Sequence, residues 1–91
     1  MKGNIGINEE IKRRIKLSIA AYAYEFDNNS IISDAEFDKE SLLINPSIDT
    51  GNNLLDGFFK VFFDPSTGNW IHFHPELEGI KKLYHRYYKN S

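Results

Sequence analysis

The chain has no cysteine, and it has only three prolines and one tryptophan among its 91 residues. The absence of cysteine excludes disulfides, thiolate metal sites and a cysteine nucleophile. Apolar runs extend over only a few residues, which is too short to cross a bilayer, and the N-terminal residues are too polar for a secretory signal peptide. We therefore expect a cytoplasmic protein that makes no membrane contact.

Length and charge limit the fold and the partners further. A chain of 91 residues allows one compact domain, here residues 1–91, and no second one. Its 11 basic and 13 acidic side chains leave a net charge of −2, so bulk charge does not predict nucleic-acid binding. Because 41% of the residues are hydrophobic, the chain can form a core and is not expected to be disordered.

A first helix is predicted over residues 9–26. Asn8 is the expected N-cap, and Glu9 and Glu10 suit the positive end of the helix dipole. Residues 27–30 are Asp-Asn-Asn-Ser, which favour a turn and end the helix. The apolar residues expected to form its buried stripe are Ile11, Ile15, Ile19, Tyr22 and Phe26. A second contact face is expected to widen this stripe, formed by Leu17, Ala20, Ala21 and Tyr24.

A second helix is predicted over residues 34–43. Ser33 and Glu36 form a capping box, in which the serine side chain accepts a hydrogen bond from the backbone three residues later. Phe37 is expected to face inwards. The two helices then make a helical hairpin over residues 8–43.

The rest of the chain is less regular. Residues 44–74 are rich in loop-forming and aromatic side chains; within them, 54–63 fits either a short helix or a buried strand, and 70–74 suggests a short extended piece. Pro75 is expected at the first position of a last helix within residues 75–91. The predicted fold class is therefore mostly α: an N-terminal hairpin, an irregular middle and a C-terminal helix.

The hairpin sequence resembles the small Ia domain of bacterial NAD-dependent DNA ligases. Residues 22–26 read Tyr-Ala-Tyr-Glu-Phe, and residues 34–38 read Asp-Ala-Glu-Phe-Asp. The ligase domain is a helical hairpin with a Tyr-His pair followed by Asp-Ala-Glu-Tyr-Asp, and it grips the nicotinamide mononucleotide half of NAD. The resemblance implies an NMN or NAD ligand at the matching residues, which are Tyr24, Asp34, Phe37 and Asp38.

Two departures change what this resemblance implies. Glu25 stands where the ligases have histidine, and its charge would repel a phosphate, so we expect nicotinamide riboside to be preferred over the phosphorylated mononucleotide. Phe37 can stack but lacks the tyrosine hydroxyl. Purely structural roles are the alternative for these positions: Tyr24 and Phe37 in the core, Asp34 at the helix start and Asp38 in solvent.

The catalytic part of a ligase is absent. Adenylation requires a lysine within Lys-x-Asp-Gly, and the one Asp-Gly pair, at residues 56–57, follows two leucines. No serine lies in a nucleophile-elbow pattern, and no glycine-rich phosphate loop is present. We therefore predict no enzymatic activity and no catalytic residues.

Nearly the whole chain is similar to a group of small phage-encoded proteins of unassigned activity. The shared features are Arg-Arg at residues 13–14, Ile-Ile-Ser-Asp at 31–34, and a phenylalanine-rich stretch with Ser-Thr-Gly at 62–68. The similarity implies a non-enzymatic accessory protein in the host cell that binds a host or defence protein. The alternative function is a nicotinamide nucleotide-binding module.

The number of aromatic side chains suggests a protein interface. Seven Phe, five Tyr and one Trp are more than a core of this size readily hides, because a small domain buries a modest fraction of its surface. Exposed aromatic patches often mark partner sites. The residues expected to form this patch are Phe58, Phe59, Phe62, Phe63 and Trp70.

Two further groups of residues could form functional sites, but simpler explanations are favoured for both. His72, His74 and Glu76 alternate, but no fourth ligand lies at a motif spacing, so no metal site is predicted. Basic residues near the two ends of the chain would form a patch if the terminal helices pair, although a solvated helix face explains them better. These residues are Arg13, Arg14, Lys16, Lys81, Lys82, Arg86 and Lys89.

Overall fold

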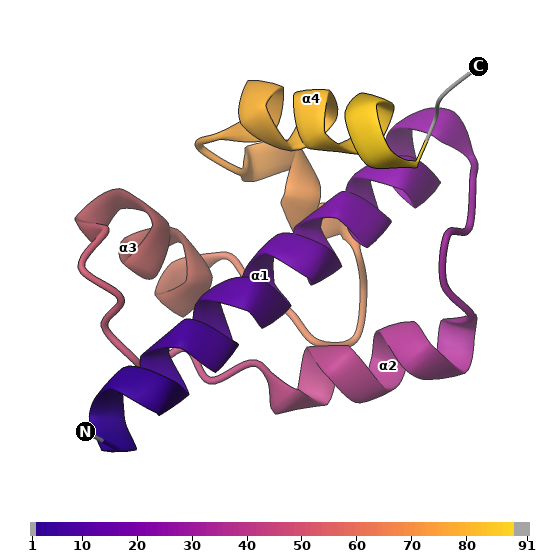
Figure 1. Ribbon diagram of the computed structural model, residues 1–91. Helices are drawn as coiled ribbons and strands as arrows, with labels where there is room; N and C mark the ends of the chain where they lie inside the picture. Colours follow the sequence, from indigo (N-terminus) through magenta and orange to yellow (C-terminus); the bar gives the residue numbers. More distant parts are fainter. Residues whose placement is uncertain (1, 89–91) are drawn as a thin grey trace.

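The computed structural model describes the backbone of residues 2–88 and the side chains from residue 6 onwards. This part of the chain is helical and contains no strand, which confirms the mostly α fold class. α1 runs through the middle of the molecule, with α2 on one side of it and α3 and α4 on the other (Figure 1). The elements are α1 (Lys2–Asp27), α2 (Asp34–Leu43), α3 (Asn53–Val61), the 3₁₀ helix η1 (Asn69–Phe73) and α4 (Leu77–Tyr87).

α1 begins well before its predicted cap. The helix starts at Lys2, so Asn8 lies inside it, and the prediction of an N-cap there is wrong. An asparagine inside a helix costs at most about 0.7 kcal/mol relative to alanine, and no proline precedes it to end the helix. At the other end, Asn28 adopts a left-handed conformation with φ of 50°, and its N–H donates to the Tyr24 carbonyl at 3.1 Å. The predicted turn therefore ends the helix, by an αL cap.

The buried face of α1 differs from the predicted stripe. Ile19 and Tyr22 are buried, but Ile15 is 41% and Phe26 45% exposed. Residues 17–23 are instead buried without interruption. This part of α1 packs against α2 on one side and against η1 and α4 on another, so nearly its whole circumference is covered.

α2 matches its prediction. It spans Asp34–Leu43, and the Ser33 hydroxyl accepts a hydrogen bond from the Glu36 backbone N–H at 3.1 Å. Phe37 is half-buried and packs against the core. The hairpin of α1 and α2 is therefore present as expected, with residues 28–33 as its linker.

The irregular middle of the chain contains more helix than predicted. Residues Asn53–Val61 form α3, which decides between helix and strand for that stretch. Residues Asn69–Phe73 form a 3₁₀ helix, so the expected extended piece is wrong. The reason is burial: Trp70 and Ile71 are consecutive and both buried, whereas successive side chains of a strand point to opposite faces.

The last helix begins later than predicted. Its first residue is Leu77 and its N-cap is Glu76, because the Glu76 backbone N–H donates to Nδ1 of His74 and its φ of −114° is not helical. Pro75 therefore precedes the helix and is not its first residue. α4 ends beside the C-terminal end of α1, where the Tyr84 hydroxyl donates to the Asp27 carboxylate (Figure 1).

A buried ion cluster fixes α3 and its preceding loop to α1. The Arg14 guanidinium donates to Glu10 at 2.7 Å and to Asp56 at 2.9 Å, and all three side chains are at most 6% exposed. It also donates to the backbone carbonyls of Asn45 and Ile48 at 3.0 and 3.1 Å. The guanidinium donates hydrogen bonds to two carboxylates and to two loop carbonyls, so these buried polar groups find their partners within the protein.

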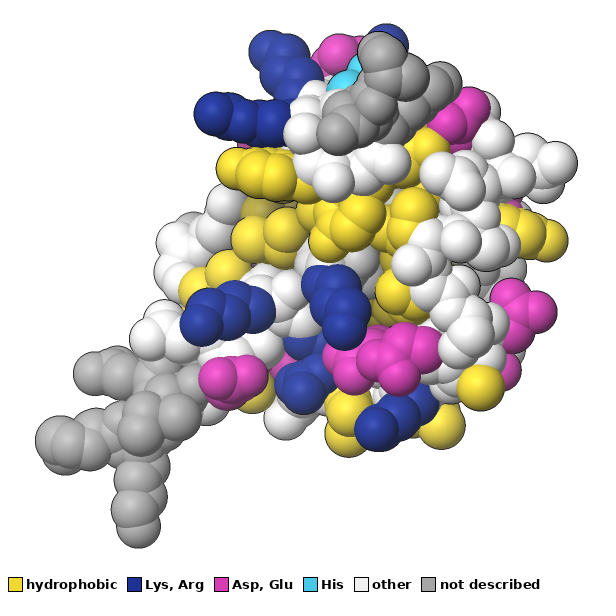
Figure 2. Space-filling model, turned by 45° about the vertical axis from the view of Figure 1, so that its right-hand side comes forward, with side chains coloured by type: hydrophobic (Ala, Val, Ile, Leu, Met, Phe, Trp, Pro, Cys, Tyr) yellow, Lys and Arg dark blue, Asp and Glu magenta, His cyan; other side chains and the backbone are white. Residues whose placement is uncertain are grey.

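Within the described residues, no helix is both long enough and apolar enough to span a bilayer. On the face shown in Figure 2, hydrophobic side chains form a band between basic side chains above and a mixed cluster of acidic and basic side chains below.

Candidate functional site

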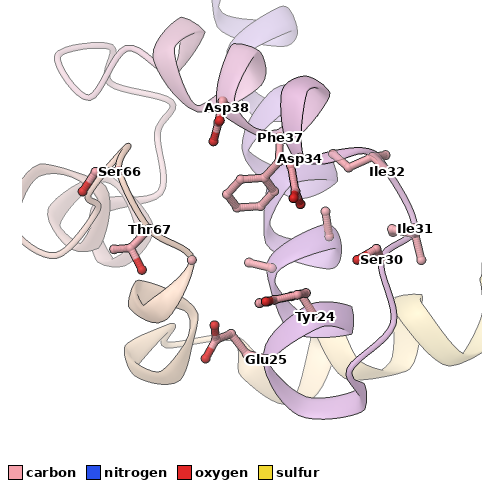
Figure 3. Close-up of a pocket in the computed structure, with 13 residues that line it drawn as sticks. Tyr24, Glu25, Ser30, Ile31, Ile32, Asp34, Phe37, Asp38, Ser66 and Thr67 are labelled. Atoms are coloured by element: carbon pink, nitrogen blue, oxygen red, sulfur yellow. The ribbon is translucent and has the colours of Figure 1, made fainter.

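The four residues predicted to bind a ligand line one pocket. It has a volume of about 250 Å³ and lies between the C-terminal half of α1, the linker, the start of α2 and the loop at residues 66–68 (Figure 3). Tyr24 comes from α1, whereas Asp34, Phe37 and Asp38 come from α2. Residues that are far apart on two helices thus meet at one concave surface.

α2 supplies most of the polar chemistry of this pocket. Asp34 and Asp38 are one helical turn apart, so both carboxylates lie on the same face of the helix, with Phe37 beside them. Both aspartates are exposed, whereas Phe37 is half-buried. In Figure 3 the Phe37 ring projects from α2 into the space in front of the loop that carries Thr67.

Tyr24 lies outside the core. It is 56% exposed, whereas its neighbour Ala23 is fully buried, because the two side chains leave α1 in different directions. The alternative that Tyr24 is a core residue is therefore wrong. Its aromatic face is available to a ligand in the pocket.

Glu25 is held in place by η1. Its carboxylate accepts from Nε2 of His72 at 2.9 Å, and the His72 ring packs on Phe26 with centroids 4.7 Å apart. The Glu25 side chain is only 18% exposed, so its negative charge is fixed at the pocket wall. The departure from the ligase pattern therefore places an anchored carboxylate at the site.

The pocket has a negative lining. Glu25, Asp34 and Asp38 are among its lining residues, and no lysine or arginine is among the described ones. Carboxylates accept hydrogen bonds from hydroxyls and amides and attract cations. The pocket therefore suits a ligand that carries hydrogen-bond donors or a positive charge. It disfavours a phosphate, because the carboxylates repel a negative charge.

The loop opposite α2 was not identified as part of the site. It contributes Ser66, Thr67 and Gly68, and a Cβ added to Gly68 would lie 3.5 Å from the Phe37 ring. The loop is braced by Asp64, which accepts from the Ser66 N–H at 2.9 Å, and this hydrogen bond holds the pKa of Asp64 below its usual 3.8. The sequence shows the turn, but its position facing α2 depends on long-range packing.

The suggested metal ligands do not come together. His72 points to Glu25, whereas His74 is buried beside Phe58 and accepts from the Glu76 backbone. Across residues 2–88 no cluster of His, Asp and Glu could hold a metal ion. Burial by itself lowers the pKa of His74 to about 4, so its imidazole is neutral near pH 7.

Three of the five residues predicted to form an exposed aromatic patch are buried. Phe58, Phe59 and Trp70 are 5%, 2% and 2% exposed, so that part of the prediction is wrong. They pack against one another and against the rest of the core, with ring centroids 5.2 to 6.2 Å apart. Phe63 is half-buried, and Phe62 is 50% exposed.

The basic residues near the start of the chain do not form a free patch. Arg14 is buried, Arg13 pairs with Glu40 at 3.1 Å, and Lys16 lies 3.6 Å from Glu36. Lys89 lies outside the described residues. The acidic side chains of α2 thus neutralise the basic side chains of α1.

Comparison with protein families, with curated proteins and with solved structures found no match to this chain.

Proposed function

We propose that the pocket between α1 and α2 binds a nicotinamide nucleoside or nucleotide, with nicotinamide riboside preferred. The observation that carries this proposal is that Tyr24, Asp34, Phe37 and Asp38 line one pocket. These are the residues that match the ligand-binding positions of the ligase Ia domain, which the hairpin sequence resembles. Packing of α1 against α2 brings these residues together, and the concave surface that they line is what a binding site requires.

The lining explains how such a ligand would be held. The nicotinamide ring of the oxidised riboside is cationic and aromatic, so it suits aromatic side chains next to carboxylates. Asp34 and Asp38 can accept hydrogen bonds from ribose hydroxyls or from the carboxamide. The pocket of about 250 Å³ is at the small end for ligand sites, which favours one nucleoside over a dinucleotide.

Calorimetric titration with nicotinamide riboside and with NMN tests the proposal. We expect saturable heat with the riboside and weaker binding of NMN, because Glu25 and the aspartates repel its phosphate. Asp38→Asn keeps the shape but removes a charge and should weaken riboside binding roughly tenfold, as for hydrogen bonds to charged groups. Glu78→Gln, which removes an exposed carboxylate on α4, is the matched control.

Two results would contradict the proposed binding of nicotinamide riboside at this pocket. An absence of heat with either ligand at millimolar concentration would exclude the proposal. Equal weakening by Asp38→Asn and by Glu78→Gln would mean that general charge, not this pocket, attracts the riboside.

A second candidate function is binding of a host or defence protein, which the similarity to phage proteins implies. The supporting observation is an exposed aromatic pair: Phe62 and Phe73 stack with centroids 5.5 Å apart and are 50% and 65% exposed. Val61 next to them is 74% exposed. Exposed aromatic side chains of this kind are enriched in interface cores.

Affinity capture from host lysate tests this second function. We expect Phe62→Ala with Phe73→Ala to lose a partner that the unmodified chain retains. Leu42→Ala removes an equally exposed apolar side chain on α2 and serves as the control, since Leu42 is 75% exposed. Retention of the same partner by the double variant would exclude Phe62 and Phe73 as the interface.

A further inference from the structure

A larger cavity lies on the opposite side of α1 from the α2 pocket. Its volume is about 510 Å³, it opens to solvent, and it is lined by residues of α1, α3, the loop before α3, the segment before α4, and α4 itself. Sites for small ligands are typically of this size and mostly apolar, with a few polar groups that fix orientation. The apolar side chains that line it are Ile11, Ile15, Leu55, Phe59, Ile80 and Leu83.

The wall of this cavity includes a glycine, Gly79. Gly79 lies inside α4, where glycine weakens a helix relative to alanine. Its conformation does not require glycine, because its φ is not in the left-handed region and a Cβ there would meet nothing within 4 Å. Neither backbone geometry nor close packing therefore requires glycine at this position on the wall.

The wall also carries hydrogen-bond donors without acceptors. Nδ1 of His74 accepts from the Glu76 N–H at 3.0 Å, so the neutral ring carries its proton on Nε2. No described residue accepts from that Nε2–H. The hydroxyl of Ser18, on the same wall and 1% exposed, also has no partner among the described residues. A mostly apolar wall with hydrogen-bond donors that no protein group accepts suits an apolar ligand that carries a hydrogen-bond acceptor.

The charges around the cavity argue against an anionic ligand. The Arg14 guanidinium at the wall is already paired with the carboxylates of Glu10 and Asp56. Glu76 adds another negative side chain, and His74 is uncharged near pH 7. A carboxylate or phosphate would therefore meet a lining with no uncompensated positive charge.

We propose that this cavity binds an uncharged apolar molecule whose oxygen accepts a hydrogen bond from Nε2 of His74. The apolar body lies against the isoleucine and leucine side chains of α1, α3 and α4. The site is separate from the nicotinamide pocket, so either can be present without the other.

NMR titration of the isotope-labelled full chain with nonan-2-one tests this proposal. We expect saturable shifts of the methyl signals of Ile11, Leu55 and Ile80, and at least tenfold weaker binding of nonanoate. His74→Phe keeps an apolar ring but removes the donor, and it should weaken nonan-2-one binding roughly fivefold. Its affinity for toluene, which has no oxygen acceptor, should not change.

Gly79 supplies a matched pair of variants. Gly79→Leu should fill the cavity and abolish binding, whereas Gly79→Ala adds one methyl group and should leave binding nearly intact. Both remove the helix glycine, so a difference between them reports on the cavity and not on helix stability.

Three outcomes would overturn the proposal: no saturable shift with nonan-2-one, equal binding of nonanoate, or unchanged binding by Gly79→Leu. The proposal also fails if the same methyl signals shift with protein concentration alone, because a second copy of the chain would then cover the cavity.

Discussion

Carboxylates have opposite roles on the two sides of α1. On the α2 side, Asp34 and Asp38 are exposed and line a small pocket without a basic partner. On the α3 side, Glu10 and Asp56 are buried around Arg14. Under the proposed function, the same chemical group thus serves binding where it is open to solvent, and it positions the chain where it is enclosed. Variants that unpair or neutralise these groups should separate the two roles.

Loss of Arg14 should have the largest effect. Arg14→Met leaves Glu10 and Asp56 buried without their cation, and removing one partner of a buried ion pair typically costs about 3–5 kcal/mol. Arg13→Met breaks the half-buried pair with Glu40 and should cost less, about 1 kcal/mol, because both groups can still reach solvent. Urea unfolding of both variants measures the difference. A similar loss of unfolding free energy in the two variants would contradict the contrast between the two sides of α1.

Acid should have the second-largest effect, by lowering the free energy of unfolding through His74, which packs against α3. Burial lowers the pKa of His74 to about 4, from about 6.5 in the unfolded chain, so the unfolded state binds more protons between these values. Stability should therefore be complete above pH 6.5 and fall by about 1.4 kcal/mol per pH unit down to pH 4, or up to about 3 kcal/mol. Unfolding curves between pH 4 and 7 measure this slope, and His74→Phe should flatten it.

Asp56 adds a second acid-sensitive group at lower pH. Burial acts to raise its pKa, but hydrogen bonds from the Thr50 hydroxyl and N–H and the ion pair with Arg14 outweigh burial and lower it below 3.8. The contribution of the Asp56 carboxylate is thus present above pH 3.8 and is lost below it. The α3 side should lose its packing in acid in two stages, at His74 first and at Asp56 second.

The capping residue of α2 should have a moderate effect. Ser33→Ala removes the acceptor for the Glu36 N–H and should cost about 0.5–2 kcal/mol. Because α2 carries Asp34 and Phe37, the same variant should also weaken riboside binding at the pocket. Denaturant unfolding and calorimetry measure the two effects. A variant with native stability would show that the cap does not hold the start of α2.

Two glycine substitutions should have the smallest effects, and of opposite sign. Gly57 lies in α3 with nothing within 4 Å of an added Cβ, so Gly57→Ala should stabilise the chain by about 0.5–1 kcal/mol. Gly51 has a φ of 96°, which L-residues rarely adopt, so Gly51→Ala should destabilise it by about 1 kcal/mol. Thermal unfolding distinguishes the two variants by their midpoint temperatures. A shift of both midpoints in the same direction would contradict this prediction.

The α1–α2 hairpin shows how far local patterns reach. Ser33 and Glu36 predicted the start of α2, and residues 27–30 predicted the end of α1, because caps and turns depend on a few neighbouring residues. The start of α1 was missed because an asparagine at position 8 permits a cap but does not impose one. The four residues of the pocket were selected by resemblance, and their spacing on the hairpin brings them together.

The middle of the chain shows where local patterns fail. The aromatic side chains at 58, 59 and 70 were expected at the surface because their number seemed too large for the core. They are buried because the rings of α3 and η1 pack against one another, η1 packs against α1 and α4, and Arg14 of α1 lies over the Phe59 ring. The side on which an aromatic residue lies depends on which helices pack together, and composition does not contain that information.

By itself, the amino-acid sequence determined the helical class, the hairpin, the end of α1 and the cap of α2, since helix periodicity and capping act over a few residues. Only the tertiary structure decided that Arg14 is the centre of a buried ion cluster, and that Gly79 and His74 share the wall of an apolar cavity. The ion cluster joins residues 42 positions apart, Arg14 and Asp56, and the cavity wall joins His74 and Gly79 to residues of α1. Contacts over such distances along the chain depend on how all the helices pack at once, so no local pattern specifies them.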